Sequence, residues 1–120
     1  MPFELEAPFF LFRNDNLVLT VKRGEYRGLP GGIPRQNEPP YDYALRIMPE
    51  FANLGDLGWW WVRSEERGEW DNTLVRLSVF EFPSSSVVSL KNSGTEWTDI
   101  GRDDQTFDVT IRIARKIPRR

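Results

Sequence analysis

The 120-residue chain contains no cysteine and no histidine, and these absences exclude a large part of protein chemistry. Without cysteine there is no disulfide, zinc finger, CxxC redox pair or cysteine nucleophile. Without histidine there is no Ser-His-Asp triad. A chain of this length is expected to form one domain, residues 1–120, whose core is stable without such cross-links. The composition therefore favours a binding protein over an enzyme.

Long hydrophobic runs are missing as well. The longest nearly apolar stretch, Ala7 to Phe12, is far shorter than the roughly 20 residues that cross a bilayer. Glu4 and Glu6 precede the first basic residue, Arg13, which is not the charge pattern of a secretory signal peptide. These features predict a cytoplasmic or otherwise intracellular protein with no membrane segment.

Charge of both signs is present, but it is unevenly distributed. The net charge is −2, yet residues 38–108 hold fourteen acids and six bases, whereas residues 109–120 hold five bases and no acid. An acidic body with a short basic C-terminal tail favours electrostatic steering of a partner. The same balance argues against direct binding of duplex DNA.

Apolar residues alternate with period two in several segments, which is typical of β-strands. The last segment alternates most clearly, with Phe107, Val109, Ile111 and Ile113 on one face. In the first, Pro8 cannot donate a ladder hydrogen bond, so that strand should lie at an edge or carry a bulge. The expected strands are 3–11, 17–21, 41–47, 59–63, 73–82, 87–90 and 107–113. They predict an all-β, single-domain antiparallel β-sandwich or barrel of about seven strands with low helix content.

A helix is the alternative for residues 43–54. Leu45, Met48 and Phe51 also fit helical spacing, although Pro49 interrupts it. Residues 24–40 are rich in glycine and proline and predict a long loop. Within this loop, residues 29–32 read Leu-Pro-Gly-Gly, but the Ile33-Pro34 that follows does not begin a helix, so we expect no nucleotide binding here.

Tryptophan is the most distinctive residue type. Residues 59–61 are consecutive tryptophans, and period two sends Trp60 to the opposite face from its neighbours. Two interpretations are open: these rings fill the core, or some form an exposed platform of the kind that binds proteins or sugars. The candidate binding aromatics are Trp60, Trp70, Trp97 and Tyr26.

Carboxylates gather at two places. Glu65, Glu66, Glu69 and Asp71 are expected in a loop after the tryptophan strand, either as a self-paired charged surface or as a binding surface. A catalytic carboxylate pair for glycosidic bonds is a minor alternative there. The second group is the candidate for Ca²⁺, although its spacing favours a turn capped by Asp side chains; its members are Asp99, Asp103 and Asp104.

Taken together, these patterns predict a protein that binds and does not catalyse. Its partner is expected to be another protein, met by an acidic surface with exposed aromatics, as in a small intracellular inhibitor or accessory protein. No cofactor is expected apart from the calcium candidate. The alternatives are a lectin-like carbohydrate-binding module and a structural subunit of a larger assembly, such as a viral one.

Overall fold

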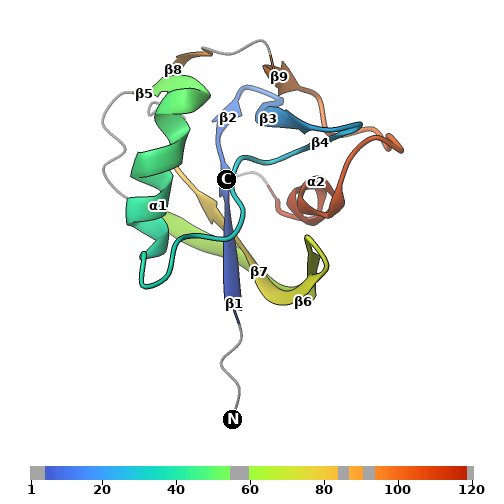
Figure 1. Cartoon of the computed structure of the whole chain (residues 1–120). Helices are drawn as coiled ribbons and strands as arrows, with labels where there is room; N and C mark the ends of the chain where they lie inside the picture. The colour runs from blue at the N-terminus through green and yellow to red at the C-terminus, as the bar shows by residue number, and fades with distance from the viewer. Residues whose placement is uncertain (1–4, 55–59, 84–86, 91–93, 119–120) are drawn as a thin grey trace.

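The computed structural model describes residues 5–54, 60–83, 87–90 and 94–118 (Figure 1). In chain order the elements are β1 Leu5–Leu11, β2 Arg13–Asn14, β3 Leu17–Arg23, β4 Tyr26–Gly28, α1 Pro40–Ile47, the 3-10 turn η1 Met48–Glu50, β5 Ala52–Leu54, β6 Trp61–Trp70, β7 Thr73–Glu81, β8 Val87–Leu90, β9 Thr95–Thr98 and α2 Val109–Arg115. No helix in these ranges is long and apolar enough to cross a membrane.

The strands form separate, open sheets. In the first sheet β7 lies in the middle, parallel to β1 and antiparallel to β6. In the second, β3 pairs with β2, β4 and β9, and the third consists of β5 and β8. The hairpin β6–β7 turns at Asp71 and Asn72, whose φ values of 50° and 59° fit a two-residue type I′ turn.

Strand β1 lies between two hydrophobic cores. Because successive strand residues point to opposite faces, Ala7 and Phe9 enter the core that α2 covers, whereas Phe10 enters the core that α1 covers. Figure 1 shows the two helices on opposite sides of β1. Both faces of this strand are therefore buried, which explains why its apolar residues are nearly continuous.

The predicted all-β sandwich or barrel is only partly right. The chain is mainly β, and the expected strands at 17–21, 73–82 and 87–90 are present as β3, β7 and β8. The sheets do not close, β1 and β7 are parallel, and two helices cover the faces. Pro8 lies in β1, which is at the edge of its sheet, as its missing N–H requires.

Two predicted strands are helices. The predicted strand 107–113 gives way to α2, Val109–Arg115, because Asp108 caps this helix, with Oδ1 accepting the Thr110 N–H at 2.9 Å. Thr110, Ile113 and Ala114 are buried at helical spacing. Residues 41–47 form α1, which begins at Pro40 and buries Tyr43 and Ala44. The apolar residues of both segments fit a period of two as well as a period of 3.6. Burial against β1 selects the helix in each case.

The predicted loops also need correction. Glu65, Glu66 and Glu69 lie within β6 and not in a loop after it, because this strand continues to Trp70. The predicted long loop at 24–40 contains the short strand β4. Trp59, at the start of a predicted strand, lies outside the described residues.

Candidate functional site

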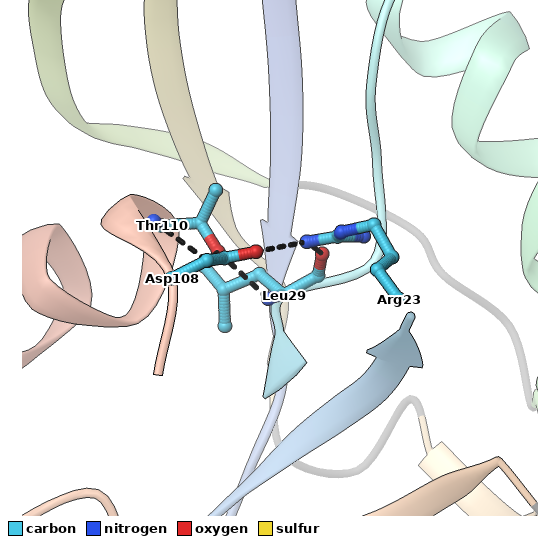
Figure 2. A network of polar contacts seen from close by, with 4 residues as sticks. All are labelled: Arg23, Leu29, Asp108 and Thr110. Atoms are coloured by element: carbon cyan, nitrogen blue, oxygen red, sulfur yellow. Dashed lines mark hydrogen bonds and ion pairs between the residues drawn. The ribbon is translucent and has the colours of Figure 1, made fainter. Parts of the chain in front are cut away.

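The loop of residues 29–32 is fixed to α2 and β3 by a buried polar network (Figure 2). The Leu29 N–H donates to Thr110 Oγ1 at 2.8 Å, and the Leu29 carbonyl accepts from Arg23 Nη2 at 2.6 Å. Thr110 Oγ1 in turn donates to Asp108 Oδ1 at 2.6 Å, and Arg23 Nη2 lies 3.1 Å from Asp108 Oδ2. Both backbone polar groups of Leu29 are thus satisfied by side chains, which holds the start of this loop in one position.

The two glycines of this loop are required by their surroundings. Gly31 has φ 140°, and a Cβ there would collide with the Pro8 carbonyl oxygen of β1. Gly32 has φ 150°, and a Cβ there would lie 3.1 Å from the Tyr43 hydroxyl of α1. The backbone also bonds to β1, with the Phe10 N–H donating to Pro30 O at 2.9 Å. Only glycine allows the loop to run between β1 and α1 at this distance.

A pocket of about 1000 Å³ opens beside this loop, and we call it the Trp70 pocket. It lies between the β3–β4 hairpin, the β6–β7 turn and the N-terminal end of α2. The Trp70 indole packs edge-on against Phe9, with ring centroids 4.7 Å apart, and the Arg23 guanidinium lies 4.7 Å from the Trp70 ring. The lining residues are Arg23, Tyr26, Glu69, Trp70, Asp71, Asn72 and Asp108.

The pocket combines one cation with three carboxylates. Arg23 Nε is buried and has no hydrogen-bond partner within the described part of the chain. Asp108 is engaged by Arg23 and Thr110, whereas Glu69 and Asp71 stand at the exposed rim. Over the described ranges no three acidic side chains gather closely enough to hold a metal ion. The pocket therefore offers an aromatic plane, a fixed guanidinium and carboxylate acceptors.

An ion pair between Glu38, just before α1, and Arg46 on α1 adjoins the same loop. Glu38 accepts from Arg46 Nε and Nη2 at 2.8 Å each, and this pairing lowers the pKa of Glu38 from 4.5 to about 2. The guanidinium of Arg46 lies 5.3 Å from the Tyr43 ring, and burial raises the pKa of Tyr43 above its usual 10.0. This pair fixes the end of the 29–39 segment onto α1.

The structure gathers four of the predicted binding residues and separates the others. Tyr26, Glu69, Trp70 and Asp71 all line the Trp70 pocket. Trp60 is partly buried, stacks on Phe80 with centroids 4.1 Å apart, and packs against the core under α1, outside the Trp70 pocket. The remaining predicted residues, Trp97, Glu65 and Glu66, lie on β9 and along β6, outside this pocket.

The calcium candidates are engaged in turns and one surface pair. Asp99 Oδ1 accepts from the Gly101 N–H at 2.9 Å. Asp104 Oδ1 accepts from the Thr106 hydroxyl at 2.7 Å and from the Thr106 N–H at 2.8 Å, and these two bonds lower the pKa of Asp104. Asp103 pairs with Arg115 at 3.2 Å. Their oxygens are oriented towards backbone donors and Arg115.

Sequence reasoning missed Arg23 and Thr110, and it did not assign Asp108 to this site. The pattern Asp108-x-Thr110 ahead of an apolar run is a helix-start signal, and it was obscured by the stronger alternation of residues 107–113. Arg23 has no local signal, because its partners lie in the 29–32 loop and in α2.

No family model matches this chain, and no curated protein matches it in sequence. Solved structures do match in fold. A MutT Nudix hydrolase from Burkholderia pseudomallei superposes with a TM-score of 0.70 over 97% of this chain and 98% of that chain, at 15% identity. A UDP-X diphosphatase gives 0.63 over 98% and 60%, at 12% identity. A bifunctional NMN adenylyltransferase/ADP ribose pyrophosphatase from Francisella tularensis, complexed with AMP and a manganese ion, gives 0.55 over 94% and 37%, at 16% identity.

These matches overturn the function predicted from the sequence. The structural neighbours reported above are named as a Nudix hydrolase, a diphosphatase and a bifunctional protein with a pyrophosphatase, so the prediction of a non-catalytic protein-binding module is wrong, as are the lectin-like and structural-subunit alternatives. The missing histidine and cysteine misled that prediction, because they exclude only the chemistries that need those side chains. The chain has the fold of the Nudix hydrolases.

Proposed function

We propose that this protein is a hydrolase that cleaves the phosphoanhydride bond of a nucleoside-diphosphate-linked small molecule bound in the Trp70 pocket. The observation that carries the proposal is the fold match over nearly the whole of this chain and of a Nudix hydrolase. Two further neighbours are a diphosphatase of UDP-X and a pyrophosphatase of ADP ribose, which suggests the substrate class.

The chemistry of the pocket supports this substrate class. The half-buried Trp70 indole provides a plane on which a nucleobase stacks. Arg23 is held beside it by Leu29 and Asp108, so its charge is already oriented for a phosphate. Asp71 at the rim accepts hydrogen bonds from the N–H groups of a base or from sugar hydroxyls.

The reaction adds water across a P–O–P bridge. The water oxygen forms a bond to one phosphorus, the bridging oxygen leaves with the other, and two phosphomonoesters result. Glu69 is the proposed base that takes the water proton, because Asp108 is engaged by Arg23 and Thr110. Its carboxylate stands at the pocket rim, where water reaches it.

A divalent ion is the usual cofactor of this fold, with Mg²⁺ or Mn²⁺ in Nudix hydrolases. Mg²⁺ is normally held by one or two carboxylates together with substrate phosphates. The described residues do not gather three carboxylates, and Glu38 is bound bidentately by Arg46. Over the described residues no acidic cluster forms a metal site by itself, so we assign no step to a metal.

The test is a product assay on the purified chain. UDP-linked sugars, ADP-ribose and nucleoside triphosphates are each incubated with EDTA, Mg²⁺ or Mn²⁺, and mononucleotide release is measured by chromatography. We expect Arg23→Gln to raise KM and Glu69→Gln to lower kcat. Arg76→Gln, on β7 and paired with Glu6 at 3.5 Å, is the matched control for loss of a cation.

The proposal fails if folded protein releases no product from any compound under any of the three metal conditions. It also fails if Arg23→Gln, Glu69→Gln and Arg76→Gln have the same kinetic constants as the wild type.

A further inference from the structure

A second cavity lies at the C-terminal end of α2, at the opposite end of this helix from the Trp70 pocket. Its volume is about 730 Å³, and we call it the C-end cavity. Its described lining holds four cationic side chains, Arg13, Arg112, Arg115 and Lys116, and one carboxylate, Asp99. In a protein of net charge −2 this is a strong local excess of positive charge. We propose that the C-end cavity binds a phosphate group of a small molecule.

Arg13 provides a fixed charge on one side of the cavity. Its Nη2 donates to the Ile117 carbonyl at 3.2 Å, and its Nε lies 3.3 Å from Glu81 Oε2, without the alignment of a hydrogen bond. Glu81 is itself 5% exposed and is held by Arg63 at 2.6 Å. Binding an anion here costs little side-chain entropy, because Arg13 is already ordered.

The cations of α2 complete the cavity. Arg112 and Arg115 are three residues apart and therefore lie on one side of the helix. Arg112 is exposed and forms no ion pair within the ranges that the structure describes. Arg115 pairs at 3.2 Å with Asp103, whose side chain is 86% exposed, so this contact is a weak surface pair that an anion can replace.

Lys116 adds a fourth, exposed cation. Its nearest partner, Glu66, is at 4.0 Å, and the lysine side chain is 72% exposed. The single carboxylate of the lining, Asp99, has one oxygen bonded to the Gly101 N–H. The four cationic side chains of the lining therefore outnumber its single carboxylate.

The ligand is expected to carry more than one negative charge. The C-terminal end of α2 has a partial negative charge, but the four cationic side chains of the lining outweigh it and attract a multiply charged anion most strongly. A phosphate presents several acceptor oxygens to guanidinium groups and carries nearly two charges at neutral pH. Both free phosphate and the phosphate of a nucleotide have this chemistry. The inference does not depend on the proposed hydrolysis, because it concerns a separate cavity.

The test is calorimetric titration of the full chain at low salt with three probes: inorganic phosphate, inorganic pyrophosphate and UMP. Arg112→Gln/Arg115→Gln is the cavity variant, and Arg76→Gln is the control for charge loss elsewhere. We expect binding of at least one probe, at least about tenfold weaker in the cavity variant and unchanged in Arg76→Gln. Tighter binding of UMP than of phosphate identifies a nucleotide, and the reverse identifies the free anion.

Arg23→Gln separates this cavity from the Trp70 pocket. Binding at the C-end cavity persists in that variant, whereas a probe in the Trp70 pocket is lost from it. The inference is overturned if no probe binds, if the cavity variant binds as the wild type does, or if only Arg23→Gln abolishes binding. A short oligonucleotide that binds while all three probes fail also overturns it, because it indicates a nucleic-acid surface. Both substituted arginines are exposed, and the melting temperature checks that the variant stays folded.

Discussion

Helices α1 and α2 are attached to the sheets in different ways. Both ends of α2 are held by buried or half-buried polar networks, through Thr110 at its start and through Arg13 and Ile117 just beyond its end. The ion pair of α1, Glu38 with Arg46, lies near the surface, and this helix is held mainly by Tyr43 and Ala44 in an aromatic core. We therefore expect polar substitutions to be costly around α2 and mild around α1.

The largest effect is expected from Glu81→Gln. Glu81 is buried between Arg13 and Arg63, and both arginines also donate to carbonyls after α2, at Ile117 and Pro118. Removing its charge leaves two nearly buried cations without their anion. We expect the free energy of unfolding to fall by about 3–5 kcal/mol in urea denaturation.

Glu66→Gln is the matched control for Glu81→Gln. Glu66 lies on β6 and pairs with Lys116 at 4.0 Å on the surface, so we expect a loss of about 0–1 kcal/mol. Equal losses from the two variants would show that the buried network does not hold the end of α2.

Thr110→Val tests the opposite end of α2. The substitution keeps the shape of the side chain but leaves the buried Leu29 N–H without its acceptor. We expect a loss of about 1–3 kcal/mol and faster hydrogen exchange of the Leu29 amide. Thr110→Ser keeps the hydroxyl and should retain amide protection; unchanged exchange in Thr110→Val would contradict the network.

Asp108→Ala is expected to have a smaller effect at this same end. It removes the N-cap, whose Oδ1 accepts the Thr110 N–H, and the partner of Arg23. We expect a loss of about 0.5–2 kcal/mol, measured by thermal and urea unfolding. Asp103→Ala, which breaks only the exposed pair with Arg115, is the control and should change stability less. A reversed order would mean that capping does not determine where α2 begins.

The same two helices show what could be predicted from the sequence. Strands β3 and β7 were found because their alternation is long and bounded by turn residues. Helix α2 was missed, and a helix overlapping α1 was given only as the alternative for residues 43–54, because these helices are only 7 and 8 residues long and their apolar residues fit both periods. For such short segments the packing partner decides, and the parallel pairing of β1 with β7 joins residues about 70 positions apart without any local signal.

The candidate site was predictable only in part. Trp70 was predicted as a binding aromatic and Asp71 as a member of the carboxylate group, and both line the pocket. Arg23 and the 29–32 loop acquire their roles through Asp108 and Thr110, which are far away in sequence. The sequence predicted no nucleotide binding at the 29–32 loop because no helix follows it directly. In the structure, glycine at positions 31 and 32 allows the loop to approach β1 and α1 closely.

The smallest expected effect concerns α1 and depends on pH. Arg46 holds the pKa of Glu38 at about 2 in the folded protein, below its usual 4.5, so Glu38 contributes to stability above pH 4.5. That contribution falls as the pH drops from 4.5 towards about 2, because the carboxyl then protonates in the folded state too. We expect the melting temperature of the wild type to exceed that of Glu38→Gln near neutral pH and the difference to narrow over this window. The difference in melting temperature between the wild type and Arg46→Gln should narrow over the same pH window. The double variant Glu38→Gln/Arg46→Gln should have a melting temperature close to that of either single variant. A difference that stays constant down to pH 2 would show that the pair does not fix the loop to α1.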